Sequence, residues 1–103
     1  MKPIDVPPRD LEIICRILTS HLSEYDVYAF GSRTTGKARN TSDLDLVVMT
    51  SKPLDPLRRA ETKEAFSESD LSFKVDLVDW ADTSEDFRKL IEEQRVKIQD
   101  AKH

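Results

Sequence analysis

The chain has 103 residues, with 16 basic and 20 acidic side chains and a formal net charge of −4. This length suits one domain with a single modest core, and we expect residues 1–103 to form that domain. The 35% share of charged residues and the 38% share of hydrophobic residues are typical of a soluble globular protein, not of a disordered one. The negative net charge makes tight, non-specific binding to nucleic acid an unlikely activity.

The sequence also bears on the compartment in which the protein works. Cys15 is the single cysteine, so no internal disulfide can form, and this fits a reducing compartment. No apolar run approaches the ~20 residues of a membrane span, and the first eight residues lack a signal-peptide core. We therefore expect a cytoplasmic protein with no membrane partner.

The first half of the chain predicts a helix and two strands. Pro7 and Pro8 fit the start of a helix, since proline is tolerated in the first turn. Apolar residues follow at helical spacing and form one stripe: Leu11, Ile14, Cys15, Leu18 and Leu22. Residues 25–30 are predicted as a strand that runs into a Gly-Ser turn, residues 33–38 as a short helical turn, and residues 44–49 as a second strand.

The second half predicts two more helices and one or two strands. Asp55 before Pro56 is typical of a helix start, and the weakly amphipathic segment that follows extends to about residue 68. Residues 73–80 alternate as a strand, and the acids and hydroxyls of residues 83–86 begin a helix with Phe87, Leu90 and Ile91 on its buried face. Residues 96–98 alternate weakly and predict a short edge strand. The pattern indicates an α/β fold.

Residues 31–46 concentrate the most informative features of the chain. They contain both of its glycines, Gly31 and Gly36, and glycine is used where the backbone must approach another group closely or adopt a positive φ. Residues 31–42 also carry three cations and no acid: Arg33, Lys37 and Arg39. This cationic patch is local, and its size suits a triphosphate better than a nucleic acid duplex.

Two aspartates at the end of this segment favour a metal site. Asp43 and Asp45 open the strand at 44–49, and alternation places them on the same face. Two carboxylates on one face repel each other unless a cation lies between them. A divalent metal beside a phosphate-binding turn indicates a nucleotide enzyme. The Asp-x-Asp pattern alone also fits a polar strand edge or a turn cap.

The strand at 73–80 contributes a third aspartate. Asp76 lies in mid-strand, where an unpaired carboxylate is costly. It either pairs with a lysine, faces solvent, or converges with Asp43 and Asp45 on the metal site. Asp79 has the opposite parity and lies nearer the strand end, so we interpret it as a solvated surface residue.

Taken together, Gly31-Ser32, a spacer, Asp43-Leu44-Asp45 and a later strand aspartate resemble the signature of the DNA polymerase β superfamily of nucleotidyltransferases. More closely, residues 31–46 look like the minimal nucleotidyltransferases (MNT) of bacteria and archaea, and the similarity continues through residues 65–71 and 75–80. The resemblance implies a mixed sheet of three to four strands flanked by helices. It also implies transfer of a nucleoside monophosphate, with AMP from ATP as the expected group.

The resemblance further implies roles for the three aspartates. Asp43 and Asp45 would hold two Mg²⁺ ions that bridge the triphosphate and the attacking oxygen. Asp76 would ligate one of these ions and help to deprotonate the attacking hydroxyl. These three residues are the expected catalytic and metal-binding set.

The nucleotide-binding residues are expected in and after the Gly-Ser turn. Gly31 would let the backbone approach the phosphates, and Ser32 would donate its hydroxyl and amide to them. Ser42 would either position the aspartate strand or cap a turn. One or more of the three cations would neutralise the leaving pyrophosphate: Arg33, Lys37 and Arg39.

Two functions remain open at this level. The first is a working nucleotidyltransferase that acts on a hydroxyl, and the resemblance implies a small helical HEPN protein as partner in a toxin–antitoxin pair. The second is a nucleotide-binding antitoxin that neutralises its partner without catalysis. Because the chain has no second domain to cover the base or present an acceptor, we expect efficient transfer only in a hetero-oligomer with that partner. The helix at 54–68 and the C-terminal segment are the candidate docking surfaces.

Overall fold

A computed structural model describes residues 4–39 and 42–102, so Asn40 and Thr41 of the predicted motif lie outside the described residues. The elements in chain order are α1 (Pro8–His21), β1 (Val27–Phe30), α2 (Ser32–Thr35), β2 (Leu44–Val48), α3 (Pro56–Ser67), β3 (Val75–Asp79), a short 3₁₀ turn η1 (Trp80–Asp82), α4 (Glu85–Gln94) and β4 (Val96–Gln99). Each helix and strand predicted from the sequence is present, with boundaries shifted by a few residues. No helix within the described ranges is long and apolar enough to cross a bilayer.

The strands form one mixed sheet in the order β3-β2-β1-β4. β1 runs antiparallel to both β2 and β4, whereas β2 and β3 are parallel. The register places Asp45 opposite Phe30 on one side and opposite Asp76 on the other. The predicted fold class is confirmed, including the short edge strand near the end of the chain.

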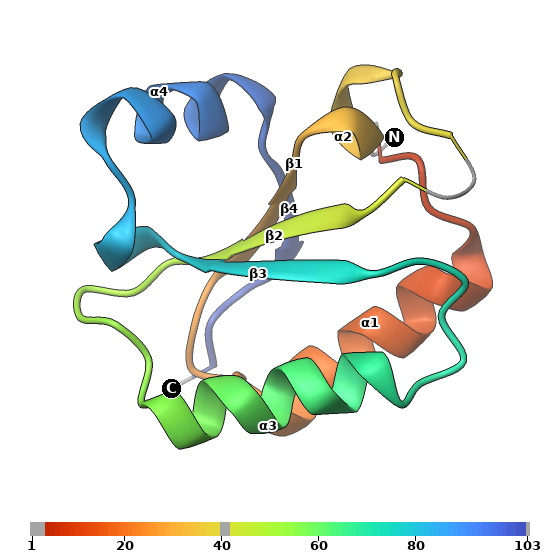
Figure 1. Cartoon of the computed structure of the whole chain (residues 1–103), viewed down its shortest axis with the longest axis horizontal. Coiled ribbons are helices and arrows are strands. Elements are labelled where there is room, and N and C mark those ends of the chain that lie inside the picture. Colours follow the sequence, from red (N-terminus) through yellow and green to blue (C-terminus); the bar gives the residue numbers. More distant parts are fainter. Residues whose placement is uncertain (1–3, 40–41, 103) are drawn as a thin grey trace.

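Helices cover both faces of the sheet (Figure 1). α1 and α3 lie together against one face, and α4 and the short α2 lie on the other side. The larger core is on the α1 and α3 side and is built around Ile14, Leu18, Leu46 and Leu77. A smaller cluster of Phe30, Val47 and Ile91 seats α4 on the opposite face. Ser32, Asp45 and Asp76 lie on the α4 side of the sheet.

The helix starts follow the predicted capping chemistry. Asp55 precedes α3, and its carboxylate accepts a hydrogen bond from the Arg58 amide at 3.2 Å. Ser84 precedes α4, and its hydroxyl accepts from the Phe87 amide at 3.1 Å. These bonds satisfy amides that the first turn of a helix leaves without an intrahelical partner.

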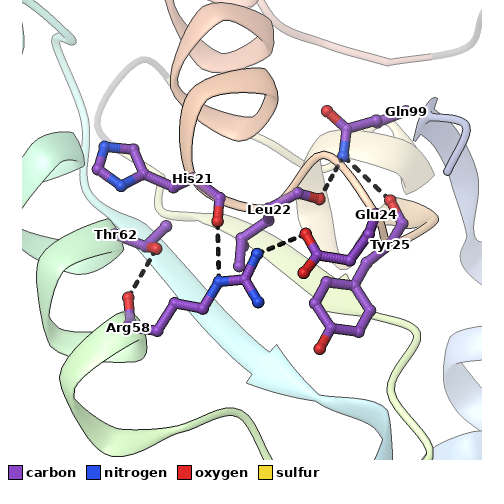
Figure 2. A network of polar contacts seen from close by, with 7 residues as sticks. All are labelled: His21, Leu22, Glu24, Tyr25, Arg58, Thr62 and Gln99. Atoms are coloured by element: carbon purple, nitrogen blue, oxygen red, sulfur yellow. Dashed lines mark hydrogen bonds and ion pairs between the residues drawn. The ribbon is translucent and has the colours of Figure 1, made fainter. Parts of the chain in front are cut away.

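A polar network ties the end of α1 to α3 and β4 (Figure 2). The Arg58 guanidinium donates to the His21 carbonyl at 3.0 Å and pairs with the Glu24 carboxylate. This ion pair lowers the pKa of Glu24. The Gln99 side chain donates to two carbonyls of the α1–β1 connection, at 2.9 and 3.0 Å. The network lies at the start of β1, and the Gly-Ser turn follows the other end of this strand.

The prediction for Asp79 is wrong. Asp79 is only 1% exposed, and its Oδ2 accepts from the Leu54 amide at 3.0 Å and from Arg59 at 2.8 Å. Its parity matches that of Leu77, so its side chain points toward α3 and not to solvent. Because the partner Arg59 comes from α3, this carboxylate links helix and sheet.

Candidate functional site

A pocket of about 480 Å³ lies between α2, the adjoining ends of β2 and β3, and α4. Its polar lining comes from Gly31, Ser32, Thr35, Lys37, Asp45 and Asp76. The rest of its lining is largely apolar and comes from Phe30, Val78, Phe87, Leu90 and Gln94. Two of the three predicted aspartates and the predicted Gly-Ser turn therefore share one concave surface.

Gly31 holds the turn close to a carboxylate. Its φ of +86° lies in the left-handed region, and a Cβ at this position would stand 2.4 Å from Asp45 Oδ2. The Gly31 carbonyl accepts two hydrogen bonds from Thr34, at 3.0 Å from the amide and 2.9 Å from the hydroxyl. Both reasons for expecting glycine here, a positive φ and a close approach, are confirmed.

The carboxylates face one another across the β2–β3 ladder. Asp45 and Asp76 are register partners, and Asp43 lies directly before β2. Burial raises the pKa of Asp45 above its usual value, and the neighbouring charges of Asp76 and Asp43 raise it further. A divalent cation at this position would relieve that repulsion, so the donor set fits such an ion. Within residues 4–39 and 42–102, however, no three Asp, Glu, His or Cys side chains form a ready-made ligand cluster.

The structure separates the three predicted cations. Lys37 is exposed and lines the pocket. Arg33 is only 3% exposed, donates to the Asp5 carbonyl at 2.7 Å, and stacks on the Phe73 ring at 4.0 Å. The structure therefore contradicts a phosphate-binding role for Arg33, because its guanidinium is buried among backbone carbonyls. Arg39 lies beside Arg33, away from the carboxylate pocket.

Ser42 also lies outside the pocket lining. Its hydroxyl accepts from the Arg39 amide at 2.8 Å, and its carbonyl accepts from the Arg33 guanidinium at 2.8 Å. Of the two roles expected for this residue, the structure shows the turn cap. A direct contact with nucleotide is not supported by this placement.

Sequence reasoning missed two polar residues of the pocket, Thr35 and Gln94. Gln94, the last residue of α4, accepts a hydrogen bond from the Gly31 amide at 2.9 Å across 63 positions of the chain. The only available signal was helical spacing, since Gln94 lies three residues after Ile91 and seven after Phe87. Those two residues were predicted to face the core, and this places Gln94 on the same side of the helix.

Comparison with known proteins shows the family of the chain. The family model described as "Polymerase beta, Nucleotidyltransferase" matches residues 12–103. The "Probable protein adenylyltransferase MntA" of Haemophilus influenzae is 52% identical over 97 residues, which cover 94% of this chain and 85% of that protein.

Solved structures show the same fold. A toxin–antitoxin crystal structure with AMP-PNP superposes with a TM-score of 0.72 at 27% identity, covering 90% of this chain and 75% of that one. The MNT antitoxin in complex with a tri-AMPylated HEPN toxin from Shewanella oneidensis superposes with a TM-score of 0.65 at 24% identity, covering 87% and 69%. The polar pocket, the mixed sheet and these similarities lead to one conclusion: the chain belongs to the polymerase β nucleotidyltransferase family, as a minimal nucleotidyltransferase.

Proposed function

We propose that this chain transfers AMP from ATP to a hydroxyl group on a protein partner. The observation that carries the proposal is the register that sets Asp45 opposite Asp76, beside the Gly31-Ser32 turn in one pocket. The similarity to a probable protein adenylyltransferase supports the choice of AMP and of a protein acceptor. The structure with AMP-PNP supports ATP as the nucleotide.

The transfer requires little covalent chemistry from the protein itself. The acceptor oxygen forms a bond to the α-phosphorus, the bond from that phosphorus to the pyrophosphate oxygen breaks, and the hydroxyl loses its proton. Asp76 is exposed in the pocket and accepts that proton, while Ser32 and Lys37 stabilise the leaving pyrophosphate. Positioning and charge neutralisation dominate such a transfer.

Two Mg²⁺ ions complete the proposal, with Asp43, Asp45 and Asp76 as their protein ligands. Carboxylate oxygens suit Mg²⁺. Burial, and then the neighbouring charges of Asp76 and Asp43, raise the pKa of Asp45, and a bound cation would stabilise its ionised form. When bound, the ions neutralise charge on the triphosphate and make the acceptor hydroxyl more acidic.

The proposed partner is a small helical HEPN-type toxin, which this chain would neutralise as its antitoxin. The support is the toxin–antitoxin assembly of the structural relative. Among the residues that the structure describes, two large apolar side chains are exposed, Leu57 on α3 (67%) and Leu90 on α4 (42%). Leu90 lies at the pocket, so a partner that covers α4 would also bring its acceptor hydroxyl near Asp76. The cytoplasmic location stays a prediction.

The test is incubation of the purified chain with ATP labelled at the α-phosphate, with and without a HEPN protein encoded next to it. We expect Mg²⁺-dependent label on the partner and none with EDTA. Asp70→Asn, at an exposed acid far from the pocket, is the matched control for Asp45→Asn. ATP binding without label on the partner would favour the non-catalytic antitoxin, and rapid transfer to a small alcohol by the single chain would contradict the need for a partner.

A further inference from the structure

Gly31 is held at both its amide and its carbonyl, by groups from different parts of the chain. On the carbonyl side, Thr34 of the adjacent short helix donates twice to the Gly31 oxygen. On the amide side, the acceptor is Gln94 Oε1, which belongs to α4 and lies 63 positions further along the chain. This hydrogen bond links α4 directly to the turn.

The backbone conformation at Gly31 matters because the Asp45 carboxylate lies close beside it. The Gly31 Cα faces Asp45, and even a Cβ would meet the carboxylate oxygen at 2.4 Å. A small rotation of the backbone at Gly31 would therefore move either the turn or Asp45.

α4 offers a firm base from which to hold the turn. Ile91, one helical turn before Gln94, is fully buried with Phe30 and Val47. Phe87 packs edge-on against the Phe30 ring, with 5.6 Å between the centroids. Phe30 directly precedes Gly31, so the same helix contacts the end of β1 and the first peptide of the turn.

We propose that Gln94 is a positioning residue of the nucleotide site: by accepting from the Gly31 amide, it keeps the Gly31-Ser32 turn in place beside Asp45. The inference rests on the proposed function, in which that turn receives the phosphates. It assigns the Gly31 amide to Gln94 and leaves the Ser32 hydroxyl and amide for the nucleotide. Loss of one such hydrogen bond corresponds to roughly a twofold to tenfold change in an equilibrium.

The chain offers a direct spectroscopic readout because it contains only two glycines. Selective ¹⁵N-glycine labelling gives one signal for Gly31, whose amide bonds to Gln94, and one for Gly36, whose amide bonds to the Ser32 carbonyl. We expect Gln94→Leu to speed hydrogen exchange of the Gly31 amide roughly fivefold or more and to leave Gly36 unchanged. Gln94→Glu keeps an acceptor oxygen at the same reach, so it restores the protection of Gly31.

The functional readout is the dissociation constant for Mg·ATP, measured by calorimetry without an acceptor. Gln94→Leu is expected to weaken binding roughly threefold to tenfold. Glu93→Leu, at the exposed neighbouring position of α4, is the matched control and keeps the wild-type constant. If Gln94→Leu does not fold, Gln94→Asn serves in its place, because its amide is one methylene too short to reach Gly31.

Each remaining outcome counts against a specific part of the argument. Unchanged exchange at Gly31 in Gln94→Leu overturns the contact in solution. Faster exchange with unchanged Mg·ATP affinity overturns the positioning role and leaves the contact structural. A wild-type chain that binds no ATP overturns the proposed function, and with it the role of Gln94. If the wild type binds Mg·ATP normally and Gln94→Leu binds it equally well, only the inference about Gln94 is overturned.

Discussion

Two aspartates of β3 illustrate how the two faces of the sheet differ. Asp79 points toward α3, where Arg59 neutralises its buried carboxylate and the Leu54 amide donates a hydrogen bond to it. Asp76, three residues earlier, lies exposed in the pocket on the other face, opposite a second carboxylate. The α3 side pairs opposite charges and gains stability, whereas the α4 side gathers like charges that a bound cation can use. The face on which a side chain lies, more than its residue type, decides its role.

The largest expected effect comes from removing charge on the pocket face. Asp45→Asn should reduce AMP transfer at least about a thousandfold, or ~4 kcal/mol, because the remaining carboxylates hold the metal poorly. The variant should be no less stable than wild type, since a repulsion is removed. Labelled transfer and urea denaturation check the two statements. Unchanged Mg·ATP affinity in the variant would contradict the assignment of Asp45.

Asp76→Asn tests whether the two pocket carboxylates differ in role. If Asp76 acts mainly on the acceptor hydroxyl, kcat should fall about a hundredfold or more while the dissociation constant for ATP changes little. Single-turnover rates and calorimetry separate the two quantities. Equal loss of rate and affinity would place Asp76 in the nucleotide-binding set instead.

On the opposite face of the sheet, removal of an aspartate should lower the free energy of unfolding. Asp79→Ala leaves the Leu54 amide and Arg59 without their acceptor, and we expect a loss of about 2–4 kcal/mol in the free energy of unfolding. The lower figure applies if water reaches Arg59, whose side chain is 32% exposed. Asp70→Ala removes the exposed pair with Arg9 and should cost less than about 0.5 kcal/mol. Similar losses in the two variants would show that Asp79 is not a structural link.

The smallest expected effect is the pH dependence of stability that Asp45 contributes on the pocket face. The pKa of Asp45 is raised above 3.8 in the folded protein, so the folded state holds this proton more tightly than the unfolded chain does. Ionised Asp45 therefore destabilises the fold at pH values above its raised pKa, and this penalty disappears as the pH falls below 3.8. In EDTA, the stability advantage of Asp45→Asn should be greatest near neutral pH and vanish in acid. An advantage independent of pH would point to packing instead.

Local sequence patterns were sufficient to predict the part of the site that contains the carboxylates and the Gly-Ser turn. Alternation within β2 and β3 placed Asp45 and Asp76 among polar positions, and the glycine at residue 31 marked a close approach that the structure bears out. Helix starts at Asp55 and Ser84 also depend on neighbours within a few residues, so they were predictable too.

Most of the partners that the sequence did not indicate come from distant parts of the chain. Asp79 was assigned the correct parity, but nothing near it indicated that Arg59 of α3 would lie opposite. Arg33 was expected at a phosphate because it follows the Gly-Ser turn, yet its guanidinium binds the carbonyls of residues 5, 39 and 42. Gln94 reaches Gly31 only once α4 has packed on β1. Sequence periodicity gives the face of a residue and does not identify its partner.

The parallel pairing of β2 with β3 also bears on the order in which the protein folds. Parallel neighbours require a crossover, and here the chain between them contains α3, whereas β1 and β2 form an antiparallel pair joined by a shorter connection. Closing the longer crossover costs more chain entropy before its contacts form. A partly folded chain can therefore bring Gly31 to Asp45 before Asp76 arrives. If Asp76 is the proton acceptor that we propose, the chain becomes competent for transfer only when the crossover has closed, and an incompletely folded chain does not modify its partner.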